Sequence, residues 1–190
     1  MSPNNERRTK DETVSFGGFV RPLEMGDLVQ LKPILEHWVK SRDTGQPLPE
    51  EVLEDLQLME DSVNRLNDYR YFTAVGVKGE VVGVIGMRPP DSRMLALDFL
   101  QTDKPVELVN AYVDPKQRGG KGVGRALVGM LEQAAVVQGY TEVVLNSGPR
   151  YRDTGWGFYD KLPGYQRVGV AIGYFGKDGD APVWKKSLVS

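Results

Sequence analysis

A glycine-rich loop between an apolar stretch and a helical pattern is the feature that most constrains this chain. Residues 105–127 read PVELVNAYVDPKQRGGKGVGRAL. The first part is largely apolar, with β-branched and aromatic residues, which predicts a strand buried on at least one face and ended by Asp114 and Pro115. After the glycines, apolar residues recur at helical spacing up to about Gln138, and Gly139 is a typical helix stop.

A strand, a glycine loop and a helix in this order are typical of an anion-binding site. The first N–H groups of a helix have no carbonyl partner, and the helix dipole adds partial positive charge there. The common nucleotide loops do not fit. Gly120-Lys121 is followed by Gly122 instead of the Ser or Thr of a triphosphate-binding loop, and the sixth position of a dinucleotide fingerprint would be Arg125 or Leu127 instead of glycine.

Elsewhere, the periodicity predicts two further helices and two hairpins. The first helix begins near Asp27, which forms a plausible capping pair with Gln30, and Pro33 should kink or interrupt it. The second helix begins at Pro49. The segment Met94–Leu100 fits either a strand or a buried crossing. The predicted strands are Tyr71–Val77 and Val81–Met87 as a hairpin, Glu142–Leu145, and Tyr165–Phe175 with Pro182–Leu188 as a terminal hairpin.

These elements predict one α/β domain. Strand, long helix and strand make a parallel βαβ unit, and the hairpins add antiparallel pairs, so the sheet is mixed. The 190 residues show no Pro-rich or charge-poor break in the middle, which indicates a single domain over residues 17–190. Residues 1–16 are polar and charged, and we expect a disordered or loosely attached tail.

The composition excludes several classes of protein. The chain has no cysteine, which removes disulfides, zinc–thiolate sites and a cysteine nucleophile, and we predict no metal. No apolar run approaches the roughly 18 residues of a membrane span, and the N-terminus has no signal-peptide pattern, so we expect a cytoplasmic protein without a membrane partner. A net charge of −2 gives no general attraction for nucleic acid.

Four blocks of sequence, in order, resemble the GNAT acyltransferase superfamily. The central one is a basic or amide residue, then Gly122-Val123-Gly124 and Leu127, which is similar to the coenzyme A loop of that family. It has one residue more than the usual spacing, so either Arg118 takes the usual Gln/Arg place through a bulge, or the register is Gln117-x-x-Gly120-x-Gly122. The other blocks are Phe19–Pro22 with Asp27-Leu28, Gly79–Gly86, and Trp156–Tyr165.

The resemblance implies a fold and a ligand. The expected GNAT fold has a mixed, mostly antiparallel sheet of about six to seven strands, flanked by about four helices and splayed between strands 4 and 5. Acetyl-CoA is the implied co-substrate, with its diphosphate on the loop amides and its pantetheine arm along the edge of the central strand. The implied cofactor-binding residues are Ala111, Tyr112, Val113, Gln117, Arg118, Gly119, Gly120, Lys121, Gly122, Val123, Gly124, Arg125, Asn146 and Arg152.

The resemblance also implies two catalytic residues. Glu107 lies six residues before Val113, the spacing of the catalytic glutamate in the histone acetyltransferase branch of the family, and is the candidate base. The alternatives are an exposed glutamate near a strand start, and a site that uses water alone. Tyr159 occupies the Phe-Tyr position of the family, where its phenol could protonate the departing thiolate; otherwise it is a packed aromatic.

Other polar residues have two interpretations each. Arg152 could reach a coenzyme phosphate or face solvent, and Asn146 and Ser147 could face the cleft or be turn residues. An acidic cluster most simply forms a solvated helix face, although part of it could front the acceptor pocket and attract a cationic amine. The cluster consists of Glu50, Glu51, Glu54, Asp55, Glu60 and Asp61.

The expected activity is transfer of an acetyl group from acetyl-CoA to a primary amine of a small molecule or a protein, by direct attack in a ternary complex. The alternative is a non-catalytic sensor or regulatory module that binds acyl-CoA with the same fold. Pairing of the terminal strands between two copies would make a homodimer.

Overall fold

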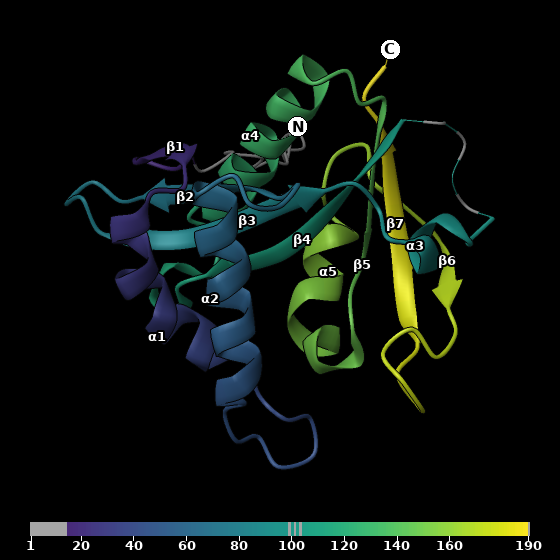
Figure 1. Ribbon diagram of the computed structural model, residues 1–190, viewed down its shortest axis with the longest axis horizontal. Coiled ribbons are helices and arrows are strands. Elements are labelled where there is room, and N and C mark those ends of the chain that lie inside the picture. The colour runs from purple at the N-terminus through teal and green to yellow at the C-terminus, as the bar shows by residue number, and fades with distance from the viewer. Residues whose placement is uncertain (1–14, 99, 101, 103, 190) are drawn as a thin grey trace, which may run out of the picture.

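The computed structural model describes residues 15–98, 100, 102 and 104–189, and within this part the chain forms one seven-stranded sheet (Figure 1). The strand order is β1-β2-β3-β4-β5-β7-β6. The strands are β1 (Phe19–Pro22), β2 (Arg70–Val75), β3 (Val81–Arg88), β4 (Pro105–Val113), β5 (Glu142–Asn146), β6 (Gln166–Ala171) and β7 (Ala181–Ser187). The helices are α1 (Leu28–Trp38), α2 (Pro49–Val63), α3 (Ser92–Leu95), α4 (Val123–Val137) and α5 (Gly157–Tyr159), and short 3-10 or π turns lie at Met25–Asp27, Pro115–Gln117, Pro149–Tyr151 and Arg152–Trp156.

The sheet opens between β4 and β5. These strands are parallel and pair over three positions only, Pro105 with Glu142, Val106 with Val143 and Glu107 with Val144. Beyond Glu107, β4 continues to Val113 with β3 as its partner, while β5 pairs with β7. Every other pairing is antiparallel. The mixed sheet splayed between the fourth and fifth strands, which the resemblance implied, is therefore confirmed.

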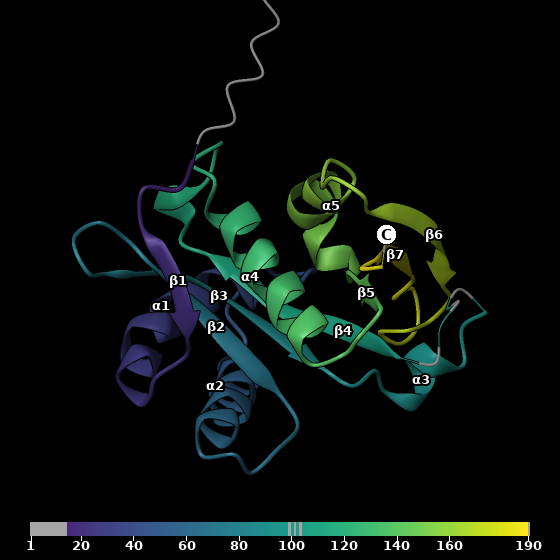
Figure 2. The same ribbon diagram turned by 90° about the horizontal axis from the view of Figure 1, so that it is seen from above.

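The helices cover both faces of the sheet (Figure 2). The apolar face of α4, with Leu127 and Leu131, packs on one face of the sheet together with Tyr159 of α5 and Trp184 of β7. On the opposite face, α1 and α2 pack against β2 and β3, and their core includes the fully buried Leu35. The cleft between β4 and β5 is thus bordered by helices on both sides.

The first helix differs from the prediction in two ways. It continues through Pro33, because Leu31, Ile34 and Leu35 are buried and this packing outweighs the lost backbone hydrogen bond. Gln30 is not the capping partner of Asp27, since its side chain accepts a hydrogen bond from Val81 N at 3.1 Å. Asp27 instead accepts from Glu24 N at 2.9 Å.

Two other segments are settled by tertiary contacts. Met94 is fully buried, but it lies in the short helix α3, and Leu95, Ala96 and Asp98 are exposed, so the described residues of this segment form neither a strand nor a buried crossing. Strand β6 ends at Ala171 and not near Phe175, because Gly173 (φ +62°) turns the chain there. Residues 1–14 of the predicted tail lie outside the described residues. None of the helices in the described part is long and apolar enough to cross a membrane.

Candidate active site

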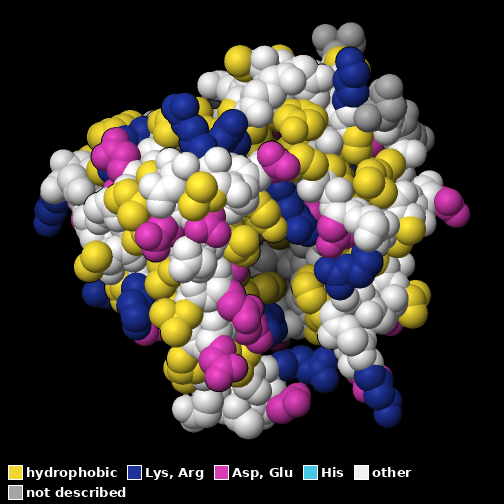
Figure 3. All heavy atoms as spheres, viewed as in Figure 1, with side chains coloured by type: hydrophobic (Ala, Val, Ile, Leu, Met, Phe, Trp, Pro, Cys, Tyr) yellow, Lys and Arg dark blue, Asp and Glu magenta, His cyan; other side chains and the backbone are white. Residues whose placement is uncertain are grey.

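A cavity of about 1040 Å³ occupies the cleft where β4 and β5 diverge. Its walls come from β4, the glycine loop with the start of α4, the end of β5 with α5, helix α2, and the loop between β6 and β7. Figure 3 shows the hollow, with acidic side chains along the side where α2 lies. The volume is in the upper range of ligand pockets, so a cofactor and a second small molecule can be accommodated together.

The glycine loop forms one end of the cavity. Helix α4 begins at Val123, and its N-cap Gly122 has φ +77°, a left-handed conformation that glycine adopts without strain. Gly122-Val123-Gly124 therefore opens the helix, which favours the register with Arg118 in the basic position. The first residues of α4, Val123 and Gly124, line the cavity, so the N-terminus of the helix lies at the cleft, where the helix dipole favours an anion.

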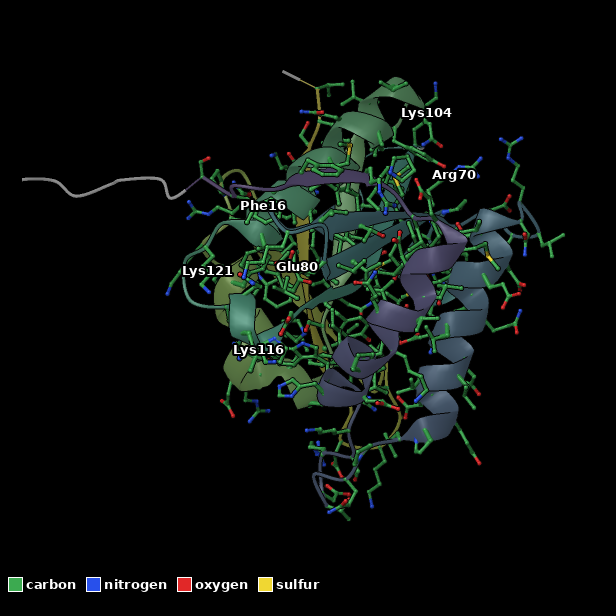
Figure 4. All side chains as sticks on the ribbon, turned by 90° about the vertical axis from the view of Figure 1, so that its left-hand side faces the viewer. Phe16, Arg70, Glu80, Lys104, Lys116 and Lys121 are labelled. Atoms are coloured by element: carbon green, nitrogen blue, oxygen red, sulfur yellow. The ribbon has the colours of Figure 1, made fainter. Side chains whose placement is uncertain are left out.

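Basic side chains surround this loop. Arg118 and Lys121 are exposed and line the cavity, as does Arg125. The Lys121 ammonium donates to the Lys116 carbonyl at 2.9 Å, and both residues lie on the loop before α4 (Figure 4). The Arg118 guanidinium lies 4.8 Å from the ring centroid of Trp38. The loop thus combines free helix amides with positive charge.

The second half of β4 forms the floor of the cavity. Ala111, Tyr112 and Val113 all line it, on the stretch where β4 has lost β5 as a neighbour. Asn110 has φ +48°, and the register with β3 shifts at this point, so β4 is bulged where it lines the cavity. The Trp38 indole donates to the Val113 carbonyl at 2.8 Å and fixes the end of the strand.

Tyr159 lies at the wall formed by α5. It is buried, its ring packs 5.4 Å from the ring of Trp184, and it lines the cavity. Burial raises the pKa of the Tyr159 phenol above its usual value. The hydroxyl therefore stays protonated at neutral pH and can act as a donor.

Glu107 is not an exposed glutamate near a strand start, which was one of the alternatives from the sequence. It is 2% exposed and lines the cavity at the last pairing position of β4 with β5. Its Oε2 accepts from Arg88 Nε at 2.9 Å, and its Oε1 accepts from Asn146 Nδ2 at 3.4 Å. Burial raises the pKa of the Glu107 carboxyl, while Arg88 acts in the opposite direction. The candidate base is thus held in an ion pair.

The remaining predicted residues divide into two groups. Asn146 and Ser147 line the cavity, and Asn146 reaches Glu107. Gln117, Gly119 and Gly120 line it as well. Arg152 does not: it is exposed and lies 5.2 Å from the Trp156 ring centroid, outside the cavity lining.

One member of the acidic cluster, Asp55, lines the cavity and belongs to a hydrogen-bonded group that the sequence did not predict. Asp55 of α2 accepts from Asn110 Nδ2 at 2.8 Å and from the Tyr112 hydroxyl at 3.3 Å. Tyr71 donates to Asn110 Oδ1 at 2.9 Å. A signal was present, because Asp55 follows Val52 by three positions and precedes Met59 by four, which places a carboxylate on the buried stripe of α2.

Within the described residues, no group of three or more His, Asp, Glu or Cys side chains is arranged to hold a metal ion.

Comparisons with known proteins agree with this architecture. The family model described as "Acetyltransferase (GNAT) family" matches residues 33–165. A solved GNAT-family structure from Desulfovibrio desulfuricans superposes with a TM-score of 0.70 at 17% identity, covering 90% of this chain and 98% of that chain. An aminoglycoside 6'-N-acetyltransferase complexed with coenzyme A gives 0.63 at 22% identity, with 90% and 98% covered.

A spermidine/spermine N-acetyltransferase from Vibrio cholerae gives a TM-score of 0.60 at 16% identity, with 89% of this chain and 91% of that chain covered. These identities are low, so the superpositions establish the fold alone. Comparison with curated protein sequences finds no significant match. Because the family model spans well over half of the residues, and the splayed sheet with its glycine loop agrees with it, the chain belongs to the acetyltransferase (GNAT) family.

Proposed function

We propose that this protein transfers an acetyl group from acetyl-CoA to a primary amine of a small molecule or a protein, by direct attack in a ternary complex. The observation that supports this most strongly is the common cavity, which is lined by the glycine loop, the free edge of β4 and the Tyr159 side chain. An anion site, a strand edge and a proton donor are the parts that acyl transfer from a coenzyme A thioester needs.

The residues present fit coenzyme A. The loop amides from Arg118 to Gly124 with the Lys121 and Arg125 side chains would hold the diphosphate, because both the helix start and the basic groups favour phosphate. Ala111–Val113 would pair with the amides of the pantetheine arm. Gly119 and Gly120 leave open space where a Cβ would project, so a bound group can approach the backbone there. When bound, acetyl-CoA supplies the activated acetyl thioester.

In this proposal Tyr159 donates a proton to the departing sulfur. Its ring is fixed by packing against Phe158 and Trp184, so the hydroxyl has a defined position at the cavity wall. Glu107 was the base expected from the sequence. Its ion pair with Arg88 joins β4 to β3 at the edge of the cleft. Its role as proton acceptor is a hypothesis that the Glu107→Gln substitution can test.

Two measurements test the proposal. Calorimetry with acetyl-CoA should show binding, and a panel of primary amines should include at least one that causes thiol release. Binding without thiol release from any amine would favour the sensor alternative. Absence of binding at millimolar acetyl-CoA would contradict both.

Several further expectations remain predictions. We propose that residues 17–190 act as one domain, since the single sheet extends from Phe19 to Ser187. A cytoplasmic location and a homodimer through the terminal strands are likewise predictions from the sequence. Size-exclusion chromatography with light scattering measures the oligomeric state directly.

A further inference from the structure

Five carboxylates line the cavity, those of Asp43, Glu51, Asp55, Glu107 and Asp178. Asp43 and Asp178 are exposed and Glu51 pairs with Arg150, which leaves Glu107 and Asp55, and these two differ in their surroundings. The Glu107 carboxylate receives two nitrogens of the Arg88 guanidinium, each at 2.9 Å, and this guanidinium also contacts Asp91 at 3.2 Å. A proton moving to Glu107 would weaken an ion pair that is buried on the glutamate side. Asp55 receives hydrogen bonds from neutral groups only, the Asn110 amide and the Tyr112 hydroxyl. Of these two carboxylates, Asp55 is therefore the one that has no cationic hydrogen-bond partner among the described residues.

Both hydrogen-bond donors to the Asp55 carboxylate lie on β4, and each of them contacts a tyrosine of another segment. Asn110 lies on the bulge of β4, where φ is +48°, and its amide is oriented because Tyr71 of β2 donates to Oδ1 while Nδ2 donates to Asp55. Tyr112 connects the same carboxylate to the other side of the cleft, since its hydroxyl lies 3.4 Å from that of Tyr151. A positioned carboxylate in the cavity loses little side-chain entropy on binding a ligand.

Charged and titratable groups from several segments face Asp55, and among them Glu51 raises its pKa while Arg150 lowers it. From α2 comes Glu51, which forms an ion pair with Arg150 at 2.8 Å near the cavity wall. From β2, β4 and the turn after β5 come the phenols Tyr71, Tyr112 and Tyr151, whose pKa values are all raised by burial. Burial raises the pKa of the Asp55 carboxyl to about 6, although its hydrogen bonds with Asn110 and Tyr112 act against this shift.

We infer that Asp55 binds the ammonium group of the acceptor and takes its proton, with Asn110 and Tyr112 as the residues that position it. This rests on the proposed acetyl transfer and names the acceptor class: a primary amine that is protonated at neutral pH. A side chain that titrates near the working pH is the most effective proton acceptor, and the negative α2 side of the hollow attracts a cation.

An N–H bond of the ammonium breaks and an O–H bond forms on Asp55, which leaves a neutral amine. The amine nitrogen bonds to the acetyl carbon, and the carbon–sulfur bond breaks. Tyr159 protonates the sulfur and regains a proton from the new amide nitrogen, directly or through water, and Asp55 releases its proton to solvent. The products are an N-acetyl amine, free coenzyme A and one proton.

The test compares wild type and Asp55→Asn on two amines of the same shape. The first is the alkylamine that gives the fastest thiol release. The second is the same amine with fluorine atoms on the carbon next to the one that carries the amino group, and this analogue is largely unprotonated at pH 7. Asp55→Asn should lower kcat/KM for the first amine by about a hundredfold and for the second by about threefold or less. It should also remove the rise of kcat/KM with pH through about 6.

Three further variants make the result specific. Glu54→Gln changes the exposed neighbouring carboxylate on α2, which does not line the cavity, and should leave the rates unchanged. Asn110→Gly tolerates the positive φ but removes the orienting amide, and should lower kcat/KM for the basic amine by about tenfold. Glu107→Gln should keep the rise with pH even if it lowers the rate. Thermal unfolding by circular dichroism confirms that each variant folds.

These measurements distinguish failure of the Asp55 assignment from failure of the proposed acetyl transfer. An equal loss on both amines, or an active Asp55→Asn with an unchanged pH profile, overturns the inference and leaves the acetyltransferase proposal intact. The inference is also overturned, with the acetyltransferase proposal intact, if the rise of kcat/KM with pH persists in Asp55→Asn and disappears in Glu107→Gln. A wild-type protein that binds acetyl-CoA but releases no thiol with any amine contradicts the proposed function itself, and the inference with it.

Discussion

Gly124 packs against the outer end of the Phe158 ring: a Cβ placed at Gly124 would come within 3.0 Å of Phe158 Cζ and 3.1 Å of Cε2. This contact joins the first turn of α4 to α5, and Phe158 is the neighbour of Tyr159, with the two rings 5.3 Å apart. The second glycine of the loop therefore connects the proposed phosphate site to the proposed proton donor through one packed ring.

Gly124→Ala should weaken both the fold and acetyl-CoA binding. The added methyl group overpacks Phe158, and we expect the free energy of unfolding to fall by about 1 kcal/mol and the Kd for acetyl-CoA to rise severalfold. Gly129→Ala in the same helix is the matched control, because no atom lies within 4 Å of its Cβ position. It should stabilise the protein by about 0.5–1 kcal/mol. Equal effects of the two substitutions in urea unfolding and calorimetry would contradict this account.

Tyr159→Phe should lower kcat by about a hundredfold and leave the Kd for acetyl-CoA nearly unchanged. The substitution removes the proton donor but keeps the ring that packs against Trp184. Tyr165→Phe is the control for loss of a buried tyrosine hydroxyl, since Tyr165 is buried but does not line the cavity. Thiol-release kinetics and calorimetry give both quantities, and an unchanged kcat in Tyr159→Phe would remove the acid role.

Asp55 should make the stability of the protein depend on pH. Its pKa of about 6 in the folded state lies above the value of about 3.9 in an unfolded chain, so the folded state binds the proton more tightly. This contribution to stability is fully present below about pH 4 and is lost as pH rises through about 6, a change of up to about 3 kcal/mol.

The Asp55→Asn variant has no carboxyl group at this position, so it lacks this loss of stability. Its free energy of unfolding relative to that of the wild type should therefore increase between pH 4 and pH 7. Urea unfolding at several pH values measures the difference, with Glu54→Gln as the control on the same helix. A difference that does not change with pH would show that Asp55 titrates as an ordinary exposed aspartate.

Removing the charge of Glu107 should destabilise the fold. Its carboxylate is 2% exposed and pairs with Arg88, so Glu107→Gln leaves a half-buried guanidinium short of one partner and should cost about 2 kcal/mol. A double-mutant cycle with Arg88→Met tests the cause. The two losses should be clearly less than additive, and full additivity in urea unfolding would show that the ion pair contributes nothing.

Asp91 should control the loop between β6 and β7. It accepts from Met94 N at 2.8 Å as the cap of α3, and the Tyr174 hydroxyl donates to it at 3.2 Å. Asp91→Ala should lower the free energy of unfolding by about 1–2 kcal/mol and raise the KM for the amine, because Tyr174 and Phe175 line the cavity. Tyr174→Phe removes only the hydrogen bond from the loop to Asp91 and keeps the cap of α3. It should therefore raise KM with a smaller loss of stability than Asp91→Ala. A normal KM in both variants would exclude this role.

Local sequence patterns predicted most of the framework. The strand before the glycine loop, the long helix from Val123 and the hairpin of β2 with β3 all follow from apolar periodicity and turn residues, which act between near neighbours in the chain. The splay between β4 and β5 came from the family resemblance. The strand, the helix and the hairpin can be predicted from the chain alone, because backbone geometry and the spacing of apolar side chains favour the same local structure wherever the segment packs.

The chemistry of the cleft was decided by tertiary structure. Asn110 lies 55 positions after Asp55, and Glu107 lies 19 positions after Arg88, so no local pattern connects the partners of either pair. The family resemblance put Glu107 at the base position, and the sequence left Asp55 in an acidic cluster that could be a solvated helix face or could front the acceptor pocket. Packing of α2 against the bulged strand desolvates Asp55 and joins it to neutral partners, while the β3–β4 pairing gives Glu107 a guanidinium. Desolvation and opposite charge set the pKa of each carboxylate, and both depend on contacts that exist only in the folded molecule.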